Sequence, residues 1–114
     1  MAYTQKFQNL ADAARALVKE VRPENVDILL AEGAILLDIR DKEEHEAGNI
    51  KGSLNISRGK LEMLVEEIIP DMKTSIICYC NAFNRGALSA ETLRQMGYIN
   101  VGFVAGGLNA YRKL

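Results

Sequence analysis

Short apolar runs alternate with stretches of helical periodicity along this chain, and that order constrains its fold more than any other feature. Four runs predict β-strands, at 34–38, 53–56, 75–79 and 100–104. The longer runs are almost continuously apolar, which is typical of strands that are covered on both faces. Because strands that alternate with helices form βα units, we expect an α/β domain built on a mostly parallel sheet.

Helices are expected where apolar residues recur at intervals of three or four positions. The expected helices span 5–21, 24–32, 42–47, 61–69, 85–96 and a short segment after Gly106-Gly107. In the first helix, the apolar positions are Leu10, Ala13, Ala14, Leu17, Val18 and Val21. In the helix over 85–96, we expect Leu88, Leu93 and Met96 to face the core.

The composition narrows the classes of partner. The chain has 114 residues, a length typical of one domain, and its net charge is −1. This balance gives no electrostatic reason to expect nucleic acid or an anionic membrane as a partner. No apolar stretch approaches the length of a membrane span, and the N-terminus lacks the apolar core of a signal peptide. We therefore expect a cytoplasmic protein, whose thiols stay reduced.

The chain has two cysteines, Cys78 and Cys80. On a strand their side chains would lie on the same side, but with Cα atoms about 6.5–7 Å apart they fit a disulfide poorly. Together with the single histidine they make a weak metal set, so we expect no metal. Cys78 lies inside the apolar run and is expected to pack in the core.

Cys80 has a different setting, because it ends the run and precedes a predicted helix. A thiol there faces unpaired backbone N–H groups and the positive end of a helix dipole, both of which favour the reactive thiolate. Arg85 follows after four loop residues, namely Asn81, Ala82, Phe83 and Asn84. So short a loop can curl its N–H groups around one small anion. We therefore predict that Cys80 is a nucleophile and that Arg85 is a catalytic residue, whose fixed positive charge favours the thiolate.

Two further polar junctions follow strands, at Asp38-Ile39-Arg40 and at 105–107. The carboxyl ends of parallel strands lie at one edge of the sheet, where such folds place their sites. Asp38 and Arg40 form either a surface salt bridge or a brace for the loop after Cys80. His45 lies in an acidic run, 41–46, and is expected on a solvated face rather than in catalysis.

Seven segments together resemble the rhodanese-like domains. They are 36–40, Glu44, 48–56, 80–85, 93–98, 100–101 and 106–111. The resemblance implies a three-layer α/β fold, with a central, mostly parallel sheet of five strands and helices on both faces. It covers 20–114 and leaves 1–19 as an N-terminal helical extension, which either packs on the domain or forms a dimer contact. The protein is therefore expected to be a monomer or a homodimer.

The resemblance also implies a thiosulfate sulfurtransferase without cofactor or metal. In this hypothesis Cys80 takes the outer sulfur of thiosulfate or a similar donor, and the N–H groups of residues 81–86, including Gly86, stabilise the resulting persulfide. Cyanide, a thiol or a protein then accepts the sulfur. One alternative is a sulfur-carrier or sulfur-sensing module with little turnover. A cysteine-dependent phosphatase or arsenate reductase is a further alternative, but the related phosphatases have a loop one residue longer.

The chain departs from the family pattern at four positions. Asn49 stands where His is usual, Gly86 where Ser is common, and Tyr111 where Trp is usual. Phe83 occupies a loop position where Gly is frequent. If that position requires a positive φ, Phe83 is strained by about 1–2 kcal/mol; if not, Phe83 forms an apolar wall beside the pocket.

Overall fold

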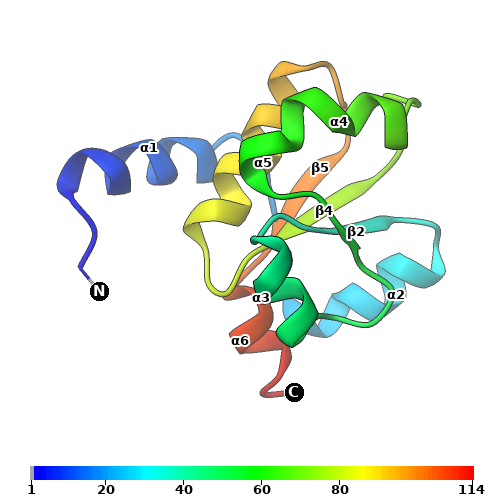
Figure 1. Ribbon diagram of the computed structural model, residues 1–114, viewed down its shortest axis with the longest axis horizontal. Helices are drawn as coiled ribbons and strands as arrows, with labels where there is room; N and C mark the ends of the chain where they lie inside the picture. The colour runs from blue at the N-terminus through cyan, green and yellow to red at the C-terminus, as the bar shows by residue number, and fades with distance from the viewer. Residues whose placement is uncertain (1) are drawn as a thin grey trace.

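The computed structural model describes residues 2–114 and has a central sheet of five parallel strands in the order β1-β5-β4-β2-β3 (Figure 1). The strands are β1 (Lys19–Val21), β2 (Ile35–Asp38), β3 (Leu54–Asn55), β4 (Ile76–Tyr79) and β5 (Val101–Val104). In the centre of the sheet, Cys78 of β4 lies between Leu37 of β2 and Phe103 of β5. The α/β class and the parallel five-stranded sheet are confirmed.

Helices cover both faces of this sheet. They are α1 (Gln5–Arg15), α2 (Val26–Ala31), α3 (Lys42–Ala47), α4 (Leu61–Ile68), α5 (Asn84–Gln95) and α6 (Gly107–Tyr111), and two 3₁₀ turns span Pro23–Asn25 and Arg58–Lys60. Residues of α4 and α5 share one apolar core with Cys78, whereas residues of α2 and α6 share a second core with Ile77 and Tyr79. Successive β4 side chains therefore point to opposite layers, as the two-residue period of a strand requires.

The predicted N-terminal helix over 5–21 is wrong beyond residue 15. The helix α1 ends at Arg15, and the edge strand β1 pairs with β5, Glu20 opposite Phe103. Helical spacing of Val18 and Val21 could not reveal this strand, because a three-residue strand at the sheet edge carries little periodicity. The strand contains a lysine and a glutamate, and such charged residues are typical of edge strands that do not pair with other chains.

The predicted inner faces of two helices also differ from the structure. Leu10 of α1 and Leu17, which follows that helix, are largely exposed; the buried residues of α1 are Ala14, as predicted, and Ala11. In α5, Leu93 is buried as predicted, but Leu88 is only half-buried, and the other buried positions are mostly small residues. They are Gly86, Ala87, Ser89, Ala90 and Glu91. Small side chains are favoured in α5 because it packs against both the sheet and α1.

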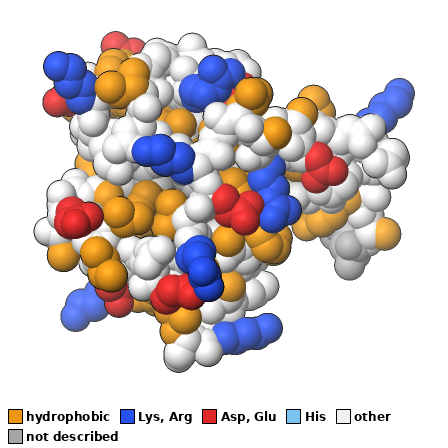
Figure 2. Space-filling model, turned by 180° about the vertical axis from the view of Figure 1, so that it is seen from behind, with side chains coloured by type: hydrophobic (Ala, Val, Ile, Leu, Met, Phe, Trp, Pro, Cys, Tyr) orange, Lys and Arg blue, Asp and Glu red, His pale blue; other side chains and the backbone are white. Residues whose placement is uncertain are grey.

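The surface shows mixed charge. On the face in Figure 2, basic and acidic side chains are interspersed and form no large patch of one sign. Within residues 2–114, no helix combines the length and the apolarity that a membrane crossing requires.

Candidate active site

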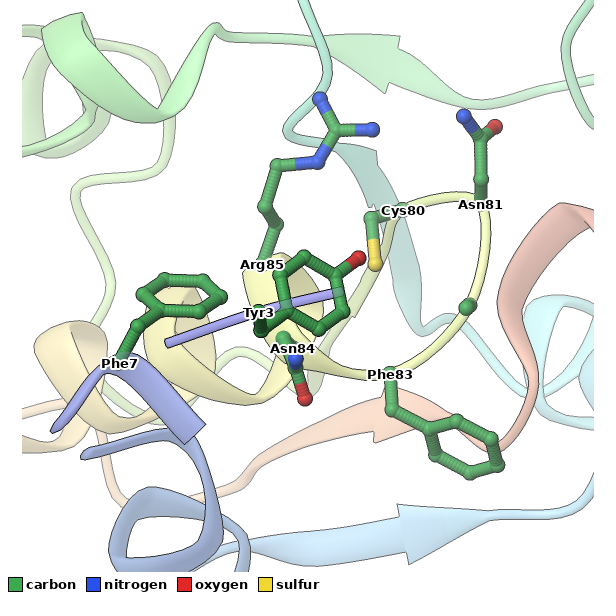
Figure 3. A pocket seen from close by; sticks show the side chains of 8 residues that line it. Tyr3, Phe7, Cys80, Asn81, Phe83, Asn84 and Arg85 are labelled. Carbon is green, nitrogen blue, oxygen red and sulfur yellow. The ribbon is translucent and has the colours of Figure 1, made fainter. Parts of the chain in front are cut away.

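Cys80 directly follows β4, and its backbone enters a loop that ends at the first turn of α5. The residue is only 3% exposed, yet it lines a pocket of about 200 Å³. Figure 3 shows its sulfur directed toward the inside of the curve that the loop describes. The other lining residues are Tyr3, Phe7, Asn81, Ala82, Phe83, Asn84 and Arg85. The structure thus brings the predicted loop residues 81–85 together around the Cys80 thiol.

Two carbonyl groups at the start of the loop accept hydrogen bonds from backbone N–H groups of α6. The N–H of Leu108 donates to the Cys80 carbonyl at 2.8 Å, and that of Asn109 donates to the Asn81 carbonyl at 3.1 Å. Within residues 2–114, the backbone N–H groups of 81–86 have no hydrogen-bond partner. Free N–H groups on a curled loop, at a helix N-terminus, form a cradle that favours a negative charge.

The close contact between α6 and the loop depends on Gly107. Its φ is +57°, and a Cβ atom at this position would overlap the Cys80 carbonyl oxygen. The junction at 105–107 therefore meets the loop, as the position of both at the carboxyl ends of parallel strands predicted.

Arg85 lies at the start of α5 and makes a bidentate ion pair with Glu44. Its Nη1 and Nη2 atoms donate to the Glu44 carboxylate at 2.9 and 3.1 Å. These hydrogen bonds lower the pKa of Glu44 to about 2, and they raise the pKa of Arg85. Glu44 is itself fixed by a capping box, in which it accepts the Asp41 N–H at the start of α3. Glu44 was not predicted as a site residue, although the capping-box spacing from Asp41 could have indicated that its carboxylate was held in place.

Asp38 and Arg40 are buried, with side chains 0% and 4% exposed. The alternative that they form a surface salt bridge is therefore wrong. Arg40 donates to both Asp38 oxygens, at 3.0 and 2.7 Å, and its Nη1 reaches the Asn81 side chain at 3.1 Å. Burial alone would raise the pKa of Asp38, but the hydrogen bonds from Arg40 and His45 outweigh it and lower that pKa. The pair thus contacts the loop through Asn81, as the bracing alternative predicted.

His45 and Tyr79 complete this buried polar cluster. The Tyr79 hydroxyl donates to Asp38 at 3.1 Å, and His45 Nδ1 lies 2.8 Å from the same oxygen. The expectation that His45 lies on a solvated face is therefore wrong: its side chain is 21% exposed and turns inward, because Asp38 offers it a buried carboxylate. Neither residue lines the Cys80 pocket. Tyr79 was not predicted as part of this cluster. Successive side chains of a strand point to opposite faces, so its place next to Cys78 on β4 could have indicated that it lies in the second core.

Phe83 has a φ of −121°, so the position carries no left-handed strain. Its ring points away from the Cys80 sulfur (Figure 3), and the Arg15 guanidinium lies 4.3 Å from the ring centroid. Phe83 lines the pocket, as the apolar-wall alternative predicted, but its ring is turned toward α1 rather than toward the sulfur. Two further aromatic residues line the pocket, Tyr3 and Phe7, whose ring centroids are 5.2 Å apart. They were missed because nothing in the sequence predicts that α1 lies beside this loop.

The comparisons with known proteins agree with this geometry. The family model for the rhodanese-like domain matches residues 7–114. The chain belongs to the rhodanese-like domain family. A curated relative, the thiosulfate sulfurtransferase GlpE of Pseudomonas entomophila (strain L48), is 31% identical over 94 residues, which cover 82% of this chain and 84% of the relative. Such relatives support an enzyme of the sulfurtransferase type.

Two solved structures are also similar to this rhodanese-like domain. A protein of unknown function and possible tyrosine phosphatase from Rhodopseudomonas palustris CGA009 has a TM-score of 0.86 and 27% identity, over 99% of this chain and 93% of that one. The polysulfide-sulfur transferase homodimer from Wolinella succinogenes has a TM-score of 0.78 and 29% identity, over 95% of this chain and 82% of that one.

The departures of this rhodanese-like domain from the family pattern are accommodated locally. Asn49 donates its side-chain N–H to the His45 carbonyl at 2.9 Å, and Tyr111 donates its hydroxyl to Asp27 at 2.9 Å. A Cβ atom on Gly86 would lie 3.5 Å from the Cys80 nitrogen, an ordinary contact, so glycine is not required there.

The second cysteine of this rhodanese-like domain, Cys78, is buried in the core as predicted, and burial raises the pKa of its thiol. No group of three or more histidine, cysteine, aspartate or glutamate side chains within residues 2–114 is placed to hold a metal ion.

Proposed function

We propose that the protein moves sulfane sulfur from thiosulfate or a similar donor, through a persulfide on Cys80, to cyanide, a thiol or a protein. The observation that carries the proposal is the thiol of Cys80 inside a loop whose backbone N–H groups, from 81 to 86, have no partner within the described residues 2–114. The terminal sulfur of a persulfide is negative, so these donors and the α5 dipole would stabilise it.

The reaction has two steps. The Cys80 thiolate attacks the outer sulfur of thiosulfate, the S–S bond breaks, and sulfite leaves with the bonding electron pair. An acceptor such as cyanide then attacks the terminal sulfur, takes it as thiocyanate and returns the thiolate. We propose that Arg85 holds the loop closed through Glu44, and that Asp38 and Arg40 position Asn81. We also propose that residues 1–19 form an extension to a domain over 20–114.

Intact mass measurement tests the proposal directly. The protein is incubated with thiosulfate, and the expected result is a gain of one sulfur that cyanide removes. Cys80→Ser is the matched control and should gain none, because the buried Cys78 cannot replace the nucleophile. A protein with a titratable thiol that gains no sulfur from thiosulfate or polysulfide would contradict sulfur transfer. An adduct that forms but turns over slowly with every acceptor would favour a carrier or sensor.

Phosphatase chemistry is the rival proposal, because one of the similar structures is the possible tyrosine phosphatase from Rhodopseudomonas palustris. Four residues separate Cys80 from Arg85, so the cradle suits one sulfur better than a tetrahedral phosphate. We expect no turnover of aryl phosphates. Hydrolysis of p-nitrophenyl phosphate that is lost in Cys80→Ser would favour the rival.

A further inference from the structure

The first turn of α1 and the residues before it lie beside the pocket of Cys80. Tyr3 and Phe7 line this pocket together with the loop, and Figure 3 shows the Tyr3 ring between Phe7 and the Cys80 sulfur in that view. Tyr3 is 55% exposed although its ring is large and mainly apolar, and Phe7 is half-buried. These two rings give the pocket an aromatic wall next to the reacting sulfur.

The wall is held in place by contacts between α1 and the loop region. Gln8 and Asn84 exchange side-chain hydrogen bonds at 3.3 and 3.1 Å, and Arg15 stacks on the Phe83 ring. Thr4 caps α1 by accepting the Phe7 N–H at 3.3 Å. These contacts hold α1, and with it Phe7, beside the loop, and the Tyr3 ring lies against the Phe7 ring at 5.2 Å between centroids.

The charges around the pocket are already balanced. Arg85 is the only charged side chain among the described residues that line the pocket, and both its terminal nitrogens bond the Glu44 carboxylate. Arg15, beside Phe83, likewise pairs with Glu20 at 2.7 Å. A small dianion such as thiosulfate would therefore find little uncompensated positive charge, apart from the backbone N–H groups.

The pocket also has more room than such an anion needs. Its volume of about 200 Å³ corresponds to about six or seven water molecules at roughly 30 Å³ each. An apolar ring packed against aromatic side chains would fill this space and gain from its removal from water.

We infer that Tyr3 and Phe7 determine donor specificity, by binding the apolar organic group of a singly charged sulfane-sulfur donor such as an aromatic thiosulfonate. The inference rests on the proposed function. The Cys80 thiolate attacks the outer sulfur of R–SO₂–S⁻, and the bond to the sulfonyl sulfur breaks. The bonding pair leaves with the sulfinate R–SO₂⁻, and Cys80 keeps the transferred sulfur as a persulfide anion.

Three donors separate the role of the ring from that of charge: benzenethiosulfonate, methanethiosulfonate and thiosulfate. For each donor kcat/KM is compared between proteins, so the intrinsic reactivity of the donor cancels. In Phe7→Ala we expect kcat/KM for benzenethiosulfonate to fall about tenfold, the factor for one lost aromatic contact. The other two donors carry no aromatic ring, so their kcat/KM should fall by a clearly smaller factor, and the preference for benzenethiosulfonate over both should drop.

Leu10→Ala is the matched control, since Leu10 lies on the same helix, is 64% exposed and does not line the pocket. It should change none of the three values. Tyr3→Ala is the second variant, because Tyr3 precedes α1 and its loss leaves the packed helix intact. It should reproduce the selective loss.

An equal loss for all three donors in both variants, or no loss for benzenethiosulfonate in either, would overturn the inference while leaving sulfur transfer intact. If none of the donors places a sulfur on Cys80, the proposed function itself fails.

Discussion

Arg85 would be an unfavourable residue at the start of α5 if it had no partner, because a cation there opposes the helix dipole. The bidentate contact with Glu44 offsets this and fixes the guanidinium beside the loop. Arg85 is about one-third exposed, so the pair contributes little to global stability. Its main effect is therefore local, on the shape and charge of the cradle around Cys80.

We predict that Arg85→Ala weakens donor turnover more than it weakens the fold. Loss of the guanidinium releases the loop and leaves the Glu44 carboxylate uncompensated near an anionic donor. We expect kcat/KM for thiosulfate to fall about ten- to hundredfold, whereas Tm should change by no more than about 5 °C. Steady-state kinetics and thermal unfolding measure the two effects.

Arg85→Lys is the control that keeps the charge but lacks the two-pronged donor geometry. It should recover only part of the lost activity. Parallel losses of Tm and activity in Arg85→Ala would show that Arg85 acts through folding alone.

Much of the site could be predicted from residues at the ends of strands. Cys80, Asp38 and Arg40 each follow a buried apolar run, and a parallel sheet necessarily brings such positions to one edge. The direction of the Phe83 ring could not be predicted in this way, because it depends on Arg15 in a distant helix. The partnership of Arg85 with Glu44 likewise depends on how α3 and α5 approach each other.

At the level of elements, α1 shows how apolar spacing can mislead. The large apolar residues Leu10 and Leu17 are exposed, while Ala11 and Ala14 face α5. Two helices can approach closely only where their side chains are small. The buried face of α1 therefore carries alanines, although leucine is the larger and more hydrophobic residue. Periodicity alone predicted Ala14 on the buried face correctly, but it also placed Leu10 and Leu17 there, because it weighs leucine above alanine.

We predict that Ala11→Asp detaches α1 from α5, because it places an unpaired carboxylate at a position that is 1% exposed. Detachment should increase amide hydrogen exchange by more than tenfold in α1 and at the N–H groups that donate to loop carbonyls, those of Ala87, Leu108 and Asn109, since the contacts at Asn84 and Phe83 are lost with it. Hydrogen exchange with mass spectrometry measures both regions.

Ala13→Asp is the matched control, with the same change in charge on the exposed side of the same helix. Its exchange should match that of the wild type. Faster exchange in α1 without any change at the Ala87, Leu108 and Asn109 amides would contradict the view that α1 supports the loop.

At the level of the whole molecule, the sheet joins two separate apolar cores, and the site lies where loops from both layers meet. The alternation of elements made the layered architecture predictable. The place of β1 at the sheet edge was not, because its pairing with β5 links residues about 80 positions apart and no local pattern carries that information. Glu44 on α3 and Arg85 on α5 likewise connect two elements that are distant in sequence.

The ion pair between Glu44 and Arg85 makes the free energy of unfolding depend on pH. The pKa of Glu44 is about 2 in the folded protein, below its ordinary value of 4.5, because Arg85 and the Asp41 N–H stabilise the carboxylate. A depressed folded pKa means that the stabilisation is fully present above pH 4.5 and is lost as the pH falls toward 2. Since the pair is partly exposed, its contribution is at most about 1 kcal/mol.

We predict that Glu44→Gln lowers the free energy of unfolding by up to about 1 kcal/mol at pH 6, and that this difference from the wild type shrinks steadily below pH 4.5. Denaturant unfolding at pH 6, 4 and 3 measures it. Glu43→Gln is the control, because Glu43 is an exposed neighbour on α3 that forms no ion pair within residues 2–114. It makes the same change in net charge and should match the wild type at each pH. A Glu44→Gln difference that stays constant from pH 6 to pH 3 would mean that the carboxylate's charge does not link α3 to α5.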